Sequence, residues 1–194
     1  TAIEEGTFTV LAKDRPPQAS RYSTLYVRQD GQWLIAALKE WGDDTTTRPT
    51  LQNLAWLIGT WESDGPDLQA RTNYEWAENK KFIVGKFTIT QKKDKSKVST
   101  GTQIIGIDPA FAQIRAWVFD SEGGIGESTW NWDGERWEIE SHANLATGQG
   151  TSAVIFLKRV DDDAFTLQSV QRTLAGESQP DVGIVKVQRV PGGK

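Results

Sequence analysis

A regular series of short apolar segments, separated by brief polar turns, occupies the chain from residue 60 onward. The segments are rich in β-branched and aromatic residues and alternate in polarity, which is typical of β-strands. Turns this short join antiparallel neighbours, because a parallel crossover needs about a dozen residues or more. The expected strands cover residues 60–63, 70–76, 82–91, 98–107, 113–120, 124–132, 136–145, 151–160, 165–174 and 182–190.

About ten sequential antiparallel strands with no helix between them must either stack as two layers or close into a barrel. Even strand spacing and the absence of long crossovers favour closure. We therefore predict an all-β fold, an antiparallel up-and-down barrel of about ten strands whose interior can hold one small ligand. Thr50 is expected to cap a short helix before it, with apolar positions at a 3.6-residue period until Gly59.

The first forty residues predict three further strands, at 7–13, 22–28 and 33–38, the last two joined by an Asp30-Gly31 type I′ turn. Residues 42–50 contain glycine, charged residues and proline but no apolar residue, which is typical of a linker. The predicted organisation is thus a β-segment at 1–41, a linker at 42–50 and the barrel at 51–194. Because the chain has no methionine and opens almost directly on a strand, we expect a mature or truncated product of a longer protein.

Composition excludes several classes of function. The net charge of −4, without a basic stripe, argues against nucleic acid as a partner. The absence of cysteine removes disulfides and thiolate chemistry, and a single histidine argues against a histidine-built metal site, so we expect no metal and no cofactor. No apolar run approaches the roughly 20 residues that span a bilayer. The sequence predicts a soluble protein and favours the cytoplasm without fixing the location.

Two sets of residues carry a family resemblance. Gly59-Thr60-Trp61, directly after the expected helix, looks like the Gly-x-Trp opening of lipocalin-like and fatty-acid-binding-like barrels, including the nitrobindin type. Residues 101–109, 114–121 and 123–127 are similar to an uncharacterised bacterial group in which such a barrel follows a nuclear-transport-factor-2-like (SnoaL-like) domain.

Residues 5–10, 20–22 and 31–36 resemble the last three strands of that preceding domain. The resemblance implies that the rest of the domain is missing from this chain. An exposed sheet of this kind needs a partner, and we expect a homodimer through the N-terminal strands.

The nitrobindin resemblance also implies haem held through a histidine, for which His142 is the one candidate. In the strand 136–145, the odd positions Trp137, Ile139, Ala143 and Leu145 are apolar. His142 is therefore expected on the opposite, solvated face, away from any cavity. Haem binding is not expected.

The nine tryptophans are expected mostly in the core or the barrel seam, and the alternative interpretation is that some of them line a ligand cavity. The leading hypothesis is a barrel that binds a small apolar or aromatic molecule, with polar selection by a few placed groups. In the strand 113–120, both faces are partly apolar, so the sequence leaves open which face is inside. The candidate ligand-binding residues are Tyr74, Trp76, Phe87, Gln103, Trp117, Trp130 and Arg172, with Arg115 as a further polar candidate.

Two alternatives remain. The first is a metal-free hydrolase or lyase acting on a small ester-like or glycoside-like substrate. In it a barrel carboxylate, Glu127 or Asp120, acts as base, and Arg115 stabilises developing negative charge. Arg115 on the outer wall in a surface ion pair is the competing interpretation of that residue. The second alternative is an assembly module that dimerises through its N-terminal sheet.

Overall fold

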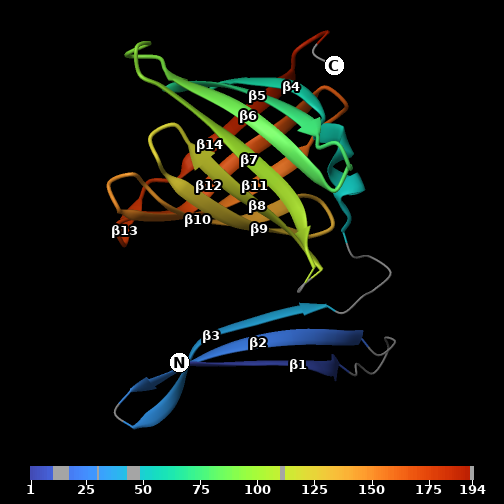
Figure 1. The fold of residues 1–194 in the computed structure, drawn as a ribbon, viewed down its shortest axis with the longest axis vertical. Coiled ribbons are helices and arrows are strands. Elements are labelled where there is room, and N and C mark those ends of the chain that lie inside the picture. Colours follow the sequence, from blue (N-terminus) through green and yellow to red (C-terminus); the bar gives the residue numbers. More distant parts are fainter. Residues whose placement is uncertain (11–17, 30, 43–48, 110–111, 193–194) are drawn as a thin grey trace. The chain divides into compact units, whose positions relative to one another are not determined.

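The computed structural model describes residues 1–10, 18–29, 31–42, 49–109 and 112–192. Two compact units divide the chain, Thr1–Arg48 and Pro49–Lys194. The first contains three antiparallel strands in the order β1 (Ala2–Val10), β2 (Gln18–Gln29) and β3 (Gln32–Gly42) (Figure 1). β1 begins earlier than predicted. The predicted strand end at 11–13, Asp30 of the predicted turn and linker residues 43–48 lie outside the described residues.

The second unit is a closed antiparallel barrel of ten strands with one extra strand (Figure 1), which confirms the predicted fold class. Closure follows from two pairings: the first barrel strand bonds to the last, with Trp61 opposite Arg189, and β11 bonds to β12. The barrel strands are β4 (Gly59–Asp64), β5 (Leu68–Trp76), β6 (Phe82–Gln91), β7 (Val98–Asp108), β8 (Gln113–Asp120), β9 (Ile125–Trp132), β10 (Trp137–Asn144), β11 (Gly150–Arg159), β12 (Ala164–Leu174) and β14 (Val182–Arg189).

Two elements differ from the sequence-based expectation. Strand β13 (Glu177–Gln179) pairs with the end of β12, where a turn was expected. The expected helix is a 3₁₀ helix, η1 (Leu51–Leu57), with bonds such as Asn53 N–H to the Thr50 carbonyl at 3.0 Å. Its buried residues Leu51, Leu54 and Leu57 recur every third position, so a helix of three residues per turn places them on one face. A 3.6-residue period would not align them.

The core fills the barrel end next to η1. Leu54 and Leu57 are completely buried there, and the rings of Trp61 and Phe165 meet with centroids 4.9 Å apart. Buried side chains from the neighbouring strands complete this layer: Ile83, Ile105, Ile114, Trp130, Trp137, Leu157 and Val187. This end is therefore solid, and any space for a ligand lies further along the barrel.

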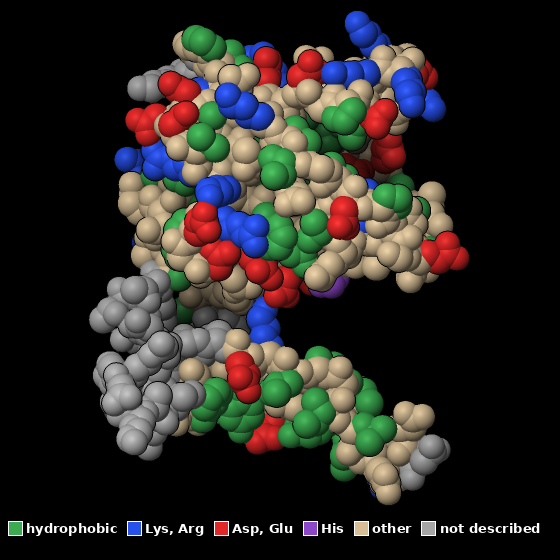
Figure 2. All heavy atoms as spheres, turned by 180° about the vertical axis from the view of Figure 1, so that it is seen from behind, with side chains coloured by type: hydrophobic (Ala, Val, Ile, Leu, Met, Phe, Trp, Pro, Cys, Tyr) green, Lys and Arg blue, Asp and Glu red, His purple; other side chains and the backbone are tan. Residues whose placement is uncertain are grey.

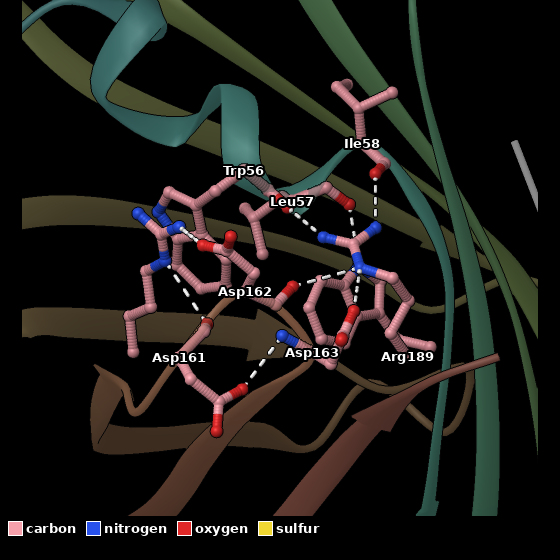
Figure 3. A network of polar contacts seen from close by, with 9 residues as sticks. Trp56, Leu57, Ile58, Asp161, Asp162, Asp163 and Arg189 are labelled. Atoms are coloured by element: carbon pink, nitrogen blue, oxygen red, sulfur yellow. Dashed lines mark hydrogen bonds and ion pairs between the residues drawn. The ribbon is translucent and has the colours of Figure 1, made fainter. Parts of the chain in front are cut away.

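Arg189, on the last strand, ties this end together (Figure 3). Its guanidinium donates to the carbonyls of Ile58 and Trp56, both at 2.8 Å, and lies 4.1 Å from the centre of the Trp61 ring. Its Nε donates to the Asp162 carbonyl and pairs with the Asp163 carboxylate at 3.2 Å. One side chain thus joins η1, the β11–β12 hairpin and the two strands that close the barrel.

Candidate functional site

The register of β8 decides which of its faces looks inward. Ile114 and Ala116 are fully buried, and Val118 and Asp120 line the cavity described below. The even positions therefore face the interior and the odd positions face outward, since side chains alternate along a strand. The question that the sequence left open for this strand is settled by these contacts.

A cavity of about 320 Å³, partly open to solvent, lies between the solid core layer and the barrel end opposite η1. Its apolar wall comes from Trp61, Trp130, Ile139, Ile155, Leu157, Phe165, Leu167 and Val187. At the open end it is bordered by the β8–β9 turn, by Asn144 at the end of β10 and by Leu145 after it.

Tyr74 and Gln103 form a polar pair on the wall. The Tyr74 hydroxyl donates to Gln103 Oε1 at 3.2 Å. Its ring lies against Gly85 of the next strand, where a Cβ would stand 2.5 Å from Cε1. Burial raises the pKa of Tyr74 to about 12, so the hydroxyl stays neutral and can donate at physiological pH. The Gln103 amide N–H groups remain to donate to a ligand.

Hydroxyl groups that the sequence analysis did not single out add to the polar wall. Ser128 is buried, and its Oγ accepts from the indole N–H of Trp130 at 3.2 Å. Thr72, Ser63 and Ser141 also line the cavity. Each of the four lies an even number of residues from an apolar residue on the same strand that faces inward, as Ser128 does from Trp130. The alternation of side chains along a strand could therefore have identified them as cavity residues.

Asp120 stands at the mouth of the cavity, where β8 ends. Its Oδ1 accepts from the backbone N–H of Glu122 at 2.9 Å and of Gly124 at 2.8 Å. These two bonds hold the carboxylate in a fixed position against the β8–β9 turn. Of the two carboxylates considered as a base, Asp120 lines the cavity from an inward position of its strand.

Arg115 and Glu127 lie together on the outer wall. Arg115 bonds to Glu127 Oε2 at 2.9 Å and to Asp108 Oδ2 at 3.1 Å, and its guanidinium is 5.9 Å from the Trp117 ring centre. Glu127 reaches the cavity lining, but its carboxylate is directed to this outer cluster. Arg115 and Glu127 therefore form an ion pair on the outer surface of the barrel, as the competing interpretation of Arg115 expected. Asp120 lies apart from them, because it occupies an inward position of β8.

The remaining candidates for ligand binding divide in the same way. Tyr74, Gln103 and Trp130 line the cavity, whereas Trp117 takes an odd, outward position on β8. Trp76 packs against the core at the η1 end, and the Phe87 ring covers Gly101. Arg172 donates to the Pro180 carbonyl at 2.7 Å and is not among the lining residues.

His142 is exposed on the outer face of β10, opposite Glu127 and Ser152. Its neighbours Ser141 and Ala143 line the cavity instead. The cavity residues therefore do not fit a histidine-held haem. Within the described residues, no cluster of three His, Cys, Asp or Glu side chains could hold a metal ion, and no helix is long and apolar enough to cross a membrane.

The charged side chains on the face shown in Figure 2 are mixed in sign, with acidic and basic groups interspersed over the barrel.

Comparison of the chain with models of known protein families finds no match, and no curated protein matches it either.

Proposed function

We propose that the barrel binds a small, largely apolar molecule in this cavity. The observation that carries the proposal is an accessible space of about 320 Å³ with an aromatic and aliphatic wall and one oriented polar pair, Tyr74 and Gln103. Small-molecule sites have this character, because apolar contact supplies affinity and a few fixed polar groups supply orientation. A lipocalin-like relationship, as the Gly59-Thr60-Trp61 opening suggests, agrees with such a role.

Binding would gain free energy mainly by removing apolar surface from water, at about 25 cal/mol per Å². The bond from the Tyr74 hydroxyl to Gln103 Oε1 fixes the orientation of the Gln103 amide. A ligand hydroxyl or carbonyl near them can accept from the Gln103 amide without breaking that bond. The site is thus pre-formed and needs little rearrangement to accept a ligand.

The test is isothermal titration calorimetry with 4-phenyl-1-butanol, an apolar probe with one hydroxyl. We expect binding to the full chain, accompanied by a change in tryptophan emission, because Trp61 and Trp130 line the cavity. Val118→Trp fills the space from the inner face of β8 and is expected to lower the affinity at least about tenfold, which is about 1.4 kcal/mol.

Phe119→Trp is the matched control, since this neighbouring residue is 44% exposed on the outer face of the same strand. It should bind as the unaltered chain does. Absence of binding by a panel of apolar alcohols, or equal binding by a folded Val118→Trp variant, would contradict the proposal.

We also propose that the N-terminal sheet pairs with a second copy of the chain. Trp33, Ile35 and Leu38 share one face of β3 by register, with a bulge between the last two, and are 53%, 61% and 55% exposed. Exposed apolar side chains gathered on one sheet face are typical of an interface. Self-association would cover them.

A further inference from the structure

The charge on the cavity wall limits which ligands it can accept. Among the lining residues, all of which the structure describes, none is a lysine, an arginine or a histidine. Asp120 and Glu127 are the acidic lining residues, and the Glu127 carboxylate is engaged by Arg115 on the outer wall. Asp120 therefore supplies the charge that a bound molecule meets.

The geometry of Asp120 leaves one of its oxygens for a ligand. Both backbone N–H groups of its turn bond to Oδ1, at 2.9 and 2.8 Å. Oδ2 accepts neither of these bonds and lies beside Gly124, where a Cβ would stand only 2.3 Å away. Glycine at this position keeps the approach to the carboxylate open. A fixed anion with a free oxygen at the mouth of an apolar cavity is a receptor for a hydrogen-bond donor that carries positive charge.

An aromatic ring lies in the same row of the barrel. Thr72, Phe87, Gly101 and Asp120 are successive partners across four adjacent strands. The outer two of these positions line the cavity, and the Phe87 ring covers Gly101, whose added Cβ would be 2.3 Å from Cζ. Phe87 is not itself a lining residue, and its ring fills the space above Gly101, between the two strands that carry Thr72 and Asp120. The surroundings of the Asp120 carboxylate are therefore apolar along this row, which strengthens its attraction for a positively charged group.

We infer that the cavity selects amines: molecules with an apolar body that fills the space beside Trp61 and Trp130 and an ammonium group that binds Asp120 Oδ2 at the mouth. This inference rests on the proposed function, because it names the ligand class of the same cavity. It also separates this barrel from one that binds fatty acids. A ligand carboxylate would face Asp120 with no wall cation to compensate for its desolvation.

Four lysines lie close together in the sequence between β6 and β7: Lys92, Lys93, Lys95 and Lys97. They lie on the β6–β7 hairpin, outside the cavity lining, and two of them have acidic partners. Lys92 Nζ is 2.7 Å from Asp64 Oδ1, and Lys93 Nζ is 3.5 Å from Asp67 Oδ1. These exposed pairs are screened by solvent and salt.

Three probes with one apolar body separate the possibilities: 4-phenylbutylamine, 4-phenyl-1-butanol and 4-phenylbutyrate, titrated calorimetrically into the full chain at neutral pH and low salt. We expect the amine to bind about tenfold more tightly than the alcohol, and the carboxylate more weakly than both. Added salt should reduce the advantage of the amine, since a partly exposed charge pair is screened.

Asp120→Asn removes the charge but keeps an acceptor oxygen for the turn, so the amine is expected to bind this variant no better than the alcohol, with alcohol affinity unchanged. Asp133→Asn is the matched control, because Asp133 Oδ1 accepts from two backbone N–H groups in the β9–β10 turn in the same way. That turn lies outside the cavity lining, so the control should keep the preference for the amine.

The outcomes distinguish the two proposals. Binding of none of the three probes would overturn the proposed function itself. Binding of the alcohol with equal or tighter binding of the carboxylate than of the amine, or an amine preference that survives in Asp120→Asn, would overturn the selection of amines and leave the ligand-binding function standing.

Discussion

The hydroxyl of Tyr74 lies inside the barrel, and its burial determines how it titrates. The pKa rises from 10.0 to about 12, because the charged phenolate would lose its hydration. The folded state favours the neutral hydroxyl more than the unfolded state does. The resulting contribution to the free energy of unfolding is fully present below pH 10. It is lost as the pH rises from 10 through about 12, where the folded protein also ionises.

Absorbance of tyrosinate during alkaline titration checks this prediction, because the chain contains only three tyrosines. Tyr22 and Tyr26 also have raised pKa values, through hydrogen bonds to Glu4. Tyr74→Phe should remove a titration step near pH 12 and leave the other two, with circular dichroism confirming that the protein stays folded. An alkaline curve that keeps all three steps in this variant would contradict the assignment.

Arg189 is the residue on which closure of the barrel end depends. We expect Arg189→Met to lower the free energy of unfolding by about 2–4 kcal/mol, because the carbonyls of Trp56 and Ile58 lose a charged donor while they stay partly buried. Urea unfolding followed by tryptophan fluorescence measures the change. Arg71→Met, which removes an exposed ion pair with Glu62, should cost about 0–1 kcal/mol. Equal effects of the two substitutions would show that the Arg189 contacts carry no special stability.

Nothing in the sequence near Arg189 indicates this role. Its partner Trp56 lies 133 residues earlier in the chain, and the two meet only because the last strand returns to the first. Tyr74, Gln103 and Trp130 could be proposed from residue type and strand parity, and they do line the cavity. Contacts between residues this far apart in the sequence, such as those of Arg189, can be predicted only once the closure of the barrel is known.

At the scale of elements, alternation and turn chemistry predicted the barrel strands well. Strand 82–91 and strand 113–120 have the predicted ends, and others differ by a residue or two. The facing of β8 could not be predicted, because Trp117 and Phe119 make its outer face as apolar as its inner one. The 3₁₀ form of η1 was missed since Leu51, Leu54, Ala55 and Ile58 fit a 3.6-residue period equally well on paper.

Strands β5 and β6 are fitted to each other through an aromatic ring over a glycine. Gly85→Ala places a Cβ 2.5 Å from the Tyr74 ring, which must move and give up its place beside Gln103. We expect a loss of about 1–3 kcal/mol in stability and weaker binding of 4-phenyl-1-butanol. Gly183→Ala on β14 meets no heavy atom within 4 Å and serves as control in the same urea unfolding experiment. A neutral Gly85→Ala with unchanged binding would show that the ring position is not fixed.

At the scale of the whole molecule, the buried core belongs to one unit. Every member of the main hydrophobic cluster lies between Leu51 and Val187, inside the unit Pro49–Lys194. The three N-terminal strands form a separate sheet with its own pairings. Stability of the barrel is therefore expected to be independent of residues 1–48, and exposed apolar residues of the N-terminal sheet are expected to govern association.

Removal of residues 1–48 tests both expectations at once. The fragment 49–194 should keep the β-sheet circular dichroism, the tryptophan emission and the probe affinity of the full chain, because all cavity residues lie within it. Light scattering after size exclusion should show a dimer for the full chain and a monomer for the fragment, since a stable dimer buries about 1,200–2,000 Å² of surface that the fragment lacks.

Leu38→Glu in the full chain is a milder test of the same association, because a charge on the apolar face of β3 opposes burial of that face. A monomeric full chain, or a fragment that still dimerises, would rule out association through the N-terminal strands, whereas an unfolded fragment would show that the barrel depends on the sheet after all.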